Sequence, residues 1–158
     1  MDGELVVGLG HSAANTLIDL AALAEEEPGT EIVWAIRAAA PDRLFGGGEA
    51  DQLEARGKLG TDLRSLVATG RIELVPGFAI ESLAVSEGAA AVTGTTDAGP
   101  RTLEGIHNIA AATGFRPDLS ILSELRLDLD PGLEAPAQLA PLIDPQFHSC
   151  GTVPPHGH

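Results

Sequence analysis

The residues best suited to chemistry are a short run of glycines and small side chains near the start of the chain, Gly8-Leu9-Gly10-His11-Ser12-Ala13. This run matches the pattern G-x-G-x-x-G/A, in which glycines let the backbone turn tightly and approach a pyrophosphate. It follows the apolar residues 5–7 and precedes a helical pattern, which is the context that the motif requires. The run therefore predicts a dinucleotide-binding loop. The alternative is a tight strand-to-helix turn without a ligand.

Each position of this loop has an expected role. Gly8 permits the tight turn, and Gly10, which has no side chain, lets a pyrophosphate approach the backbone. Ala13 is small enough for the helix to pack closely against the strand. Ser12 is expected to cap the helix, so that its free N–H groups and the positive end of its dipole face the phosphates. His11 is expected to contribute its backbone and not to act as a base.

The end of the next apolar run decides which dinucleotide fits. A carboxylate at that position binds the ribose 2′-hydroxyl of NAD and repels a 2′-phosphate. Here the run 31–37 ends in Arg37 and is followed by alanines at 38–40. An arginine without a carboxylate beside it favours NADP(H), because guanidinium forms charge-assisted hydrogen bonds with phosphate. Arg43 is a candidate second contact. The alternative is that both arginines are ordinary solvated charges.

The hydrophobic pattern predicts the elements that must position these residues. Residues 5–7 and 31–37 are predicted to be parallel strands joined by a helix over 12–26, which makes a βαβ unit. Residues 38–60 are expected to be irregular. A helix over 61–69 and a strand over 71–75 follow.

Three alternating stretches then predict an antiparallel meander, at 79–85, 89–94 and 101–105. The remaining segments are an apolar run, a short helix and a coil, at 106–112, 119–125 and 131–158. The predicted fold class is α/β: a Rossmann-like parallel sheet with flanking helices and a small antiparallel β-meander.

Composition narrows the classes of partner. The chain has 158 residues, 44% of them hydrophobic, which is enough for one domain with its own core. Nine basic and 23 acidic residues give a net charge of −14, which opposes attraction to nucleic acid or to an anionic membrane. The sequence has no apolar run long enough to cross a membrane and no basic leader. With Cys150 as the single cysteine, these features favour a cytoplasmic protein.

Three other groups are weaker candidates. Potential metal ligands gather near the end of the sequence, at His148, Cys150, His156 and His158. Their spacing matches no standard zinc pattern, so we expect no metal site; Cys150 itself is either a thiol near a flavin or an inert thiol. Residues 46–48 are three glycines without the Gly-Lys-Ser/Thr of a phosphate loop, so a turn near the nucleotide is expected. Trp34 is expected in the core. No catalytic residue is predicted.

Three segments, in order, carry a resemblance to a known family: residues 8–15 (GLGHSAAN), Arg37, and residues 111–118 (AATGFRPD). Together they resemble the NADPH-binding domain of FAD/NAD(P)-binding flavoprotein oxidoreductases, which include thioredoxin-reductase-like and flavin-containing-monooxygenase-like proteins. In that family the motif A-T-G-[FY]-x-P-[DN] ends the last strand of the NADP domain. The resemblance therefore implies that Thr113 and Gly114 lie at the cofactor.

The resemblance also implies a domain organisation. Residues 1–120 are expected to form an NADP(H)-binding Rossmann-like domain, and residues 121–158 a proline-rich tail leading toward an absent flavin-domain segment. Relatives begin with their own FAD-binding loop, whereas only seven residues precede Gly8. We therefore expect the flavin domain to be missing, and FAD to bind only in a full-length protein. The sequence has no C-x-x-C pair, which excludes thioredoxin-reductase chemistry for this chain.

The resulting hypothesis is the NADP(H)-binding portion of a FAD-dependent oxidoreductase, which presents nicotinamide for hydride transfer to a flavin. The chain alone is expected to bind nucleotide and to turn nothing over. The alternative is a non-catalytic nucleotide-binding or regulatory module, which needs no flavin partner. Methyl transfer on a similar glycine loop is disfavoured, because the acid that usually ends the second strand is absent.

Overall fold

The computed structural model describes residues 2–45, 54–115 and 117–143. The chain divides into two compact units, Met1–Gly114 and Phe115–His158. The first unit contains the β-sheet and the longer helices, and the second contains short turns and helices. Within the described ranges, no helix combines the length and the hydropathy that a bilayer crossing requires.

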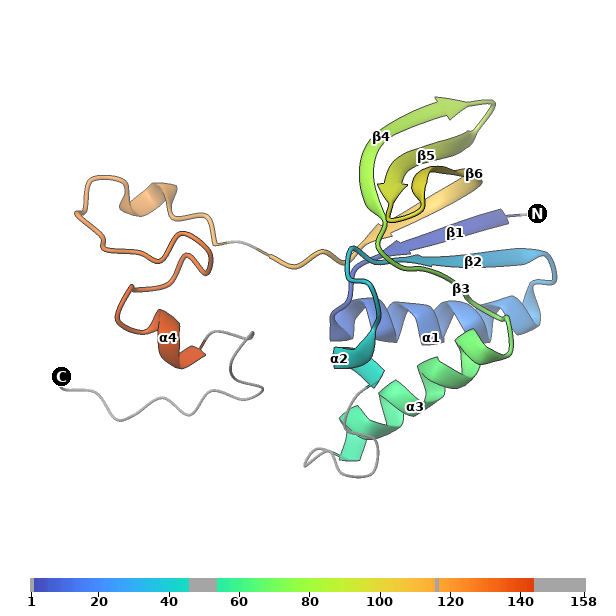
Figure 1. Ribbon diagram of the computed structural model, residues 1–158, viewed down its shortest axis with the longest axis horizontal. Coiled ribbons are helices and arrows are strands. Elements are labelled where there is room, and N and C mark those ends of the chain that lie inside the picture. The colour runs from blue at the N-terminus through green and yellow to red at the C-terminus, as the bar shows by residue number, and fades with distance from the viewer. Residues whose placement is uncertain (1, 46–53, 116, 144–158) are drawn as a thin grey trace. The chain divides into compact units, whose positions relative to one another are not determined.

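The first unit is a six-stranded mixed sheet with its helices on one face (Figure 1). The strand order is β3-β2-β1-β6-β5-β4; the pairs β3–β2, β2–β1 and β1–β6 are parallel, and β5 is antiparallel to both of its neighbours. The strands are β1 (Asp2–Val7), β2 (Thr30–Ala35), β3 (Glu73–Val75), β4 (Ala79–Ser86), β5 (Ala89–Thr96) and β6 (Gly99–Ala111). The described helices of this unit are α1 (His11–Glu26), α2 (Asp42–Phe45) and α3 (Glu54–Ala68).

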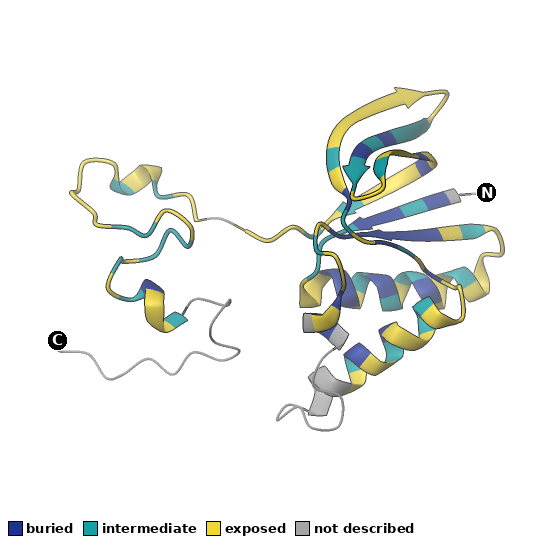
Figure 2. Ribbon diagram, viewed as in Figure 1, coloured by how far each residue is buried: buried dark blue, intermediate teal, exposed yellow. Residues whose placement is uncertain are grey.

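Two hydrophobic cores lie on the two faces of the sheet, because successive strand residues point to opposite sides. Val6 and Trp34 point toward α1 and α3 and belong to the core on the helix side. Leu5 and Val33 point the other way and pack with meander residues such as Val92. Figure 2 shows the parallel strands β1 and β2 as largely buried, whereas β4 is mostly exposed. The parallel part of the sheet is thus covered on both faces.

The second core depends on how β6 bends. Its first half pairs with β5 and its second half with β1, and the register to β1 shifts near Gly3. Gly105, inside the strand, has φ +70°, a conformation that favours glycine. Arg101 of β6 forms an ion pair with Glu73 of β3, although β3 and β6 are not neighbours in the sheet. The meander therefore curls back over the helix-free face.

The predicted α/β class is confirmed: a Rossmann-like parallel sheet with helices and an antiparallel meander. The predicted strand, helix and strand at 5–7, 12–26 and 31–37 correspond to β1, α1 and β2. The predicted segments 101–105 and 106–112 are one strand, β6, because the bend at Gly105 lets one stretch of backbone serve both the meander and the parallel sheet.

Three predictions for the middle and end of the chain were wrong, wholly or in part. Residues 38–60 are not irregular throughout, because α2 lies there and α3 begins at Glu54, well before the predicted start at residue 61. The predicted helix 119–125 is only a 3₁₀ turn, Ser120–Leu122. The predicted coil after residue 131 contains a short helix, α4 (Ala140–Ile143), within its described part.

The second unit is held by local turns. The carboxylate of Asp130 accepts hydrogen bonds from the backbone N–H groups of Gly132 and Leu133, each at 2.9 Å. Leu129 and Pro136 form an isolated antiparallel bridge. Among its described residues only Ala140 is buried. This unit is therefore ordered by backbone hydrogen bonds more than by a hydrophobic core.

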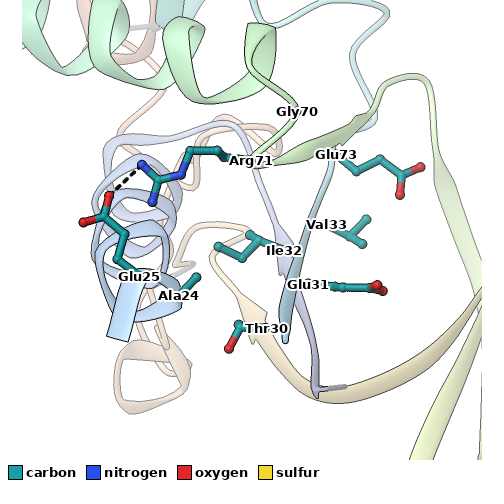
Figure 3. Close-up of a pocket in the computed structure, with 9 residues that line it drawn as sticks. All are labelled: Ala24, Glu25, Thr30, Glu31, Ile32, Val33, Gly70, Arg71 and Glu73. Atoms are coloured by element: carbon teal, nitrogen blue, oxygen red, sulfur yellow. Dashed lines mark ion pairs between the residues drawn. The ribbon is translucent and has the colours of Figure 1, made fainter. Parts of the chain in front are cut away.

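Arg71 fastens the end of α1 to the segment before β3. Its guanidinium donates a hydrogen bond to the carbonyl of Ala21 (2.6 Å) and pairs with Glu25 (2.8 Å), and Figure 3 shows this side chain reaching toward α1. The last turn of α1 has no basic residue of its own. Arg71 therefore supplies, from another element, the positive charge that favours the carboxyl end of a helix.

We predict that Arg71→Gln lowers the free energy of unfolding by about 1 kcal/mol, because the Ala21 carbonyl loses a charged donor and the last turn of α1 loses a nearby positive charge. Glu25→Gln is the matched control: the Glu25 side chain is 67% exposed, so removing the ion pair alone should cost less than about 0.5 kcal/mol. Urea unfolding of both variants measures the difference. Equal losses would mean that the ion pair, and not the helix end, accounts for the role of Arg71.

Candidate functional site

The glycine loop connects the carboxyl end of β1 to α1. Gly8 directly follows β1, and Gly10 is the N-cap residue of α1, with φ −97° and ψ 175°. A Cβ atom added to Gly10 would have no atom within 4 Å, so the space above this residue is open. A phosphate group can therefore approach the backbone at Gly10 as the motif requires.

Gly8 is the most constrained residue of the loop. Its φ is +138°, and an added Cβ would lie 2.2 Å from the carbonyl oxygen of Ala112, just beyond β6. Its N–H donates to the carbonyl of Ala35 in β2 (3.2 Å), and its own carbonyl accepts a hydrogen bond from the indole Nε1–H of Trp34 (2.7 Å). Gly8 is thus hydrogen-bonded to β2 on one side, and on the other side the backbone just after β6 leaves no room for a side chain.

Trp34 is the residue at this site that the sequence did not reveal. It was predicted as a core residue, and its side chain is indeed fully buried on the helix side of the sheet. Its hydrogen bond to Gly8 joins positions 26 residues apart and depends on the parallel pairing of β1 with β2. A buried tryptophan in the second strand is not a recognisable signal for such a contact.

The first turn of α1 presents backbone donors. In any α-helix the first N–H groups have no partner within the helix, and here these belong to His11, Ser12 and Ala13. The His11 and Ser12 residues are exposed, whereas Ala13 is fully buried where α1 packs on the sheet. The first turn has no acidic residue. The start of α1 therefore offers free N–H groups and the positive end of a helix dipole.

The predicted cap by Ser12 was wrong. The helix begins at His11 with Gly10 as its N-cap, and no side chain of the described residues caps it. Ser12 is the second residue of the helix, where its carbonyl accepts a hydrogen bond from the hydroxyl of Thr16 (2.9 Å). The extended backbone of Gly10 starts the helix two residues earlier than the sequence rule for serine caps suggests. A side-chain oxygen at the N-cap would have occupied the donors that a phosphate needs.

Arg37 lies just beyond β2, at the same edge of the sheet. The flanking backbone is fixed, because the N–H of Ile36 donates to Val75 (3.1 Å) and the carbonyl of Ala38 accepts from Gly77 (2.9 Å). Ile36 is buried and Arg37 is exposed. Among the described residues, Arg37 forms no ion pair. Its guanidinium is therefore available to an anion from solvent.

The structure says less about the other residues that are predicted to contact the cofactor, namely Arg43, Thr113 and Gly114. Arg43 lies in the four-residue helix α2, and its side chain is outside the described residues. Thr113 and Gly114 are exposed and directly follow Ala112, whose N–H donates to the carbonyl of Val7 (2.8 Å). The glycines at 46–48 and the His/Cys group at 148–158 fall outside the described residues. Where the chain is described, no cluster of three potential metal ligands occurs.

The end of the AATGFRPD segment makes a local turn. The hydroxyl and the backbone N–H of Ser120 donate to the carboxylate of Asp118, and these hydrogen bonds hold the pKa of Asp118 below its usual value. The carboxylate of Asp118 thus binds the first residue of the 3₁₀ turn at Ser120–Leu122, whose N-cap residue is Leu119. Within the segment, Arg116 is outside the described residues. The role of Asp118 in the described structure is to shape the chain after the first unit.

The structure brings most of the predicted site to one edge of the sheet. In register, Val7 lies beside Ala35 on one side and beside Ala111 on the other. The glycine loop, Arg37 and residues 113–114 follow these three paired positions, so all of them lie at the carboxyl edge of the parallel strands. Open α/β sheets bind ligands outside this edge, where the strands on the two sides of one strand lead the chain in different directions.

A shallow groove lies elsewhere, between the end of α1 and the start of β2 and β3. Its lining includes Glu25, Glu31, Arg71 and Glu73 (Figure 3). Thr30 and Glu31 begin β2, so this groove is at the amino edge of the sheet, opposite the glycine loop. Arg71 is engaged there by α1. The groove is acidic and does not bring together any of the predicted site residues.

No protein-family profile and no curated protein sequence matches this chain. Solved structures do match its fold. The FAD-bound cadaverine monooxygenase of desferrioxamine biosynthesis from Erwinia amylovora has a TM-score of 0.59 and 16% identity over 84% of this chain and 40% of that chain. The bacillithiol disulfide reductase from Bacillus cereus has a TM-score of 0.60 and 18% identity over 82% of this chain and 34% of that chain.

A third match is an engineered water-forming NADPH oxidase bound to NADPH, with a TM-score of 0.56 and 18% identity over 82% of this chain and 24% of that chain. The chain shares its fold with a part of each of these oxidoreductases. It spans between about a quarter and two-fifths of the length of these structures. At such low identity the likeness establishes the fold, and the activity of the whole proteins does not transfer with it.

The two glycines of the loop should respond differently to a methyl group. We predict that Gly8→Ala lowers the free energy of unfolding by about 3 kcal/mol or more, because the new Cβ meets backbone and the φ is unfavourable. Gly10→Ala should change it by no more than about 1 kcal/mol, because its backbone is extended and the space is open. The methyl of Gly10→Ala should nevertheless weaken binding of both NADPH and NADH.

Urea unfolding measures the first effect, and calorimetric titration of each nucleotide into Gly10→Ala measures the second. A Gly10→Ala protein that binds nucleotide as tightly as the wild type would show that the loop does not contact the pyrophosphate.

Proposed function

We propose that the chain is the NADP(H)-binding portion of a FAD-dependent oxidoreductase and that it presents the nicotinamide ring for hydride transfer to a flavin. The observation that carries this proposal is the placement of Arg37 beside the glycine loop, at the carboxyl edge of β1, β2 and β6. A dinucleotide site needs hydrogen-bond donors for the pyrophosphate, which the glycine loop would supply. It also needs a group that binds the 2′ position of the ribose, which Arg37 would supply.

The loop supports pyrophosphate binding through its backbone. Gly10 leaves open space above the chain, and the first turn of α1 has free N–H groups and no acidic residue of its own. These local dipoles act within a few ångströms of a bound phosphate. The net charge of −14 acts against an anionic ligand, but physiological salt screens it beyond about 8 Å. The local donors therefore outweigh the global charge.

Arg37 supports a preference for the 2′-phosphate of NADP(H). It is exposed, and the ion pairs among described residues leave its guanidinium unengaged. The engineered NADPH oxidase gives independent support from its own substitutions, which remove one aspartate and add two arginines. A similar combination, an arginine with no acid at the end of the second strand, occurs here at residues 36–40. Arg43 is the second candidate contact, from the start of α2.

Thr113 and Gly114 support a role near the nicotinamide half of the cofactor. They leave the sheet from β6, on the opposite side of β1 from Arg37. A dinucleotide lying across the loop would have its adenosine ribose toward β2 and its other half toward β6. The bound cofactor supplies the hydride chemistry. The residues of this chain bind the phosphates, select the ribose and orient the ring, while the flavin would be held by other segments.

We predict that the chain binds NADPH more tightly than NADH and that Arg37 provides most of the difference. A charge-assisted hydrogen bond contributes about 1.5–3 kcal/mol, or roughly a 10- to 150-fold ratio of dissociation constants. Arg37→Ala should weaken NADPH binding by about this factor and leave NADH binding almost unchanged. Calorimetric titration of both cofactors into both proteins measures the four constants.

Arg43→Ala is the parallel test of the second candidate contact. Equal losses for both cofactors in Arg37→Ala would show that Arg37 is structural. A wild-type preference for NADH would overturn the NADP(H) proposal. If only Arg43→Ala shows the selective loss, the second arginine carries the specificity in place of the first.

A further inference from the structure

Trp34 has two features that a core residue alone does not need. Its ring fills the helix-side core, where it is fully buried. Its Nε1–H also donates a 2.7 Å hydrogen bond to the carbonyl of Gly8, inside the glycine loop. The adjacent residue of β2, Ala35, accepts a hydrogen bond from the N–H of Gly8. Two consecutive residues of β2 thus bind the two ends of a single loop residue.

This arrangement fixes the orientation of the Gly8–Leu9 peptide. The bond to Trp34 directs the carbonyl of Gly8 into the protein, toward a buried ring. On the other side of Gly8, a Cβ atom would lie only 2.2 Å from the carbonyl oxygen of Ala112, so a side chain has no room there. If this peptide turned over, its carbonyl oxygen would point away from Trp34 and lose this hydrogen bond. Oxygen dipoles repel phosphate, whereas N–H groups attract it.

We infer that Trp34 is a positioning residue for the pyrophosphate site: it holds the Gly8 carbonyl inward, so that only backbone donors face the ligand. This inference rests on the proposed dinucleotide function and assigns to it a residue that never touches the ligand. Trp34 acts on the pyrophosphate, which NADPH and NADH share. Its effect on affinity must therefore be equal for both cofactors, unlike the effect of Arg37.

The experiment compares three proteins with the wild type. Trp34→Phe keeps an aromatic ring and removes the donor. A second variant replaces Trp34 by an isosteric analogue in which sulfur takes the place of the indole N–H, so that shape is kept and only the hydrogen bond is lost. Phe78→Leu is the control, because Phe78 is equally buried but belongs to the core on the other face of the sheet.

Two readouts separate a positioning role from a structural one. Calorimetric titration should show that both Trp34 variants bind NADPH and NADH about 3- to 10-fold more weakly, as expected for one hydrogen bond. Phe78→Leu should lose thermal stability and keep both dissociation constants within about twofold of wild type. Hydrogen exchange of the Gly8 and Ala14 amides, which donate to the carbonyls of Ala35 and Gly10, should be faster in the Trp34 variants and unchanged in Phe78→Leu.

The outcomes distinguish this inference from the proposed function. If the wild type binds neither cofactor, the proposed function fails, and the exchange rates of the Gly8 and Ala14 amides still decide whether Trp34 holds the loop. Unchanged exchange and unchanged affinity in the sulfur variant would overturn the inference. So would a loss of affinity in Phe78→Leu as large as that in the Trp34 variants. A loss confined to NADPH would assign the effect to the 2′-phosphate contact instead.

Discussion

The close contact of three parallel strands around Gly8 is the constraint on which the site depends. Gly8 has no room for a side chain, because the carbonyl of Ala112 occupies that space, and β2 binds its N–H and its carbonyl. This contact brings the carboxyl ends of β1, β2 and β6 together. The residues that directly follow each strand therefore also lie close to one another. The loop, Arg37 and residues 113–114 are neighbours because the strands before them are packed at Gly8.

The site then works by local charge in an acidic protein. Without salt, the net charge of −14 would repel an anionic dinucleotide over a long distance. Physiological salt screens this repulsion beyond about 8 Å. What remains within reach of a ligand is the start of α1, without an acid in its first turn, and the exposed Arg37. The groove at the amino edge of the sheet differs in this respect. Its arginine, Arg71, is already bound by Glu25 and by the carbonyl of Ala21, and its other charged lining residues are acidic.

The sequence was a good guide where a signal is local. The apolar pattern of β1 and β2 and the glycine motif between them were sufficient for the βαβ unit and for the position of the loop. The start of α3 was missed because Gly57 and Gly60 weaken helix propensity, whereas the burial of Leu63 against α1 compensates in the folded chain. The cap was misplaced because serine is favoured at N-caps in general. The hydrogen bond between Trp34 and Gly8 could not be predicted from the sequence, because it forms only when β1 and β2 pair.

The most direct test of the account is the position of the nucleotide on the chain, observed by backbone amide NMR during titration with NADPH. The account predicts that the largest shifts occur at residues 8–13, with further shifts at Arg37 and at residues 113–114. Shifts centred on the groove around Arg71, or none at all at saturating NADPH, would contradict it.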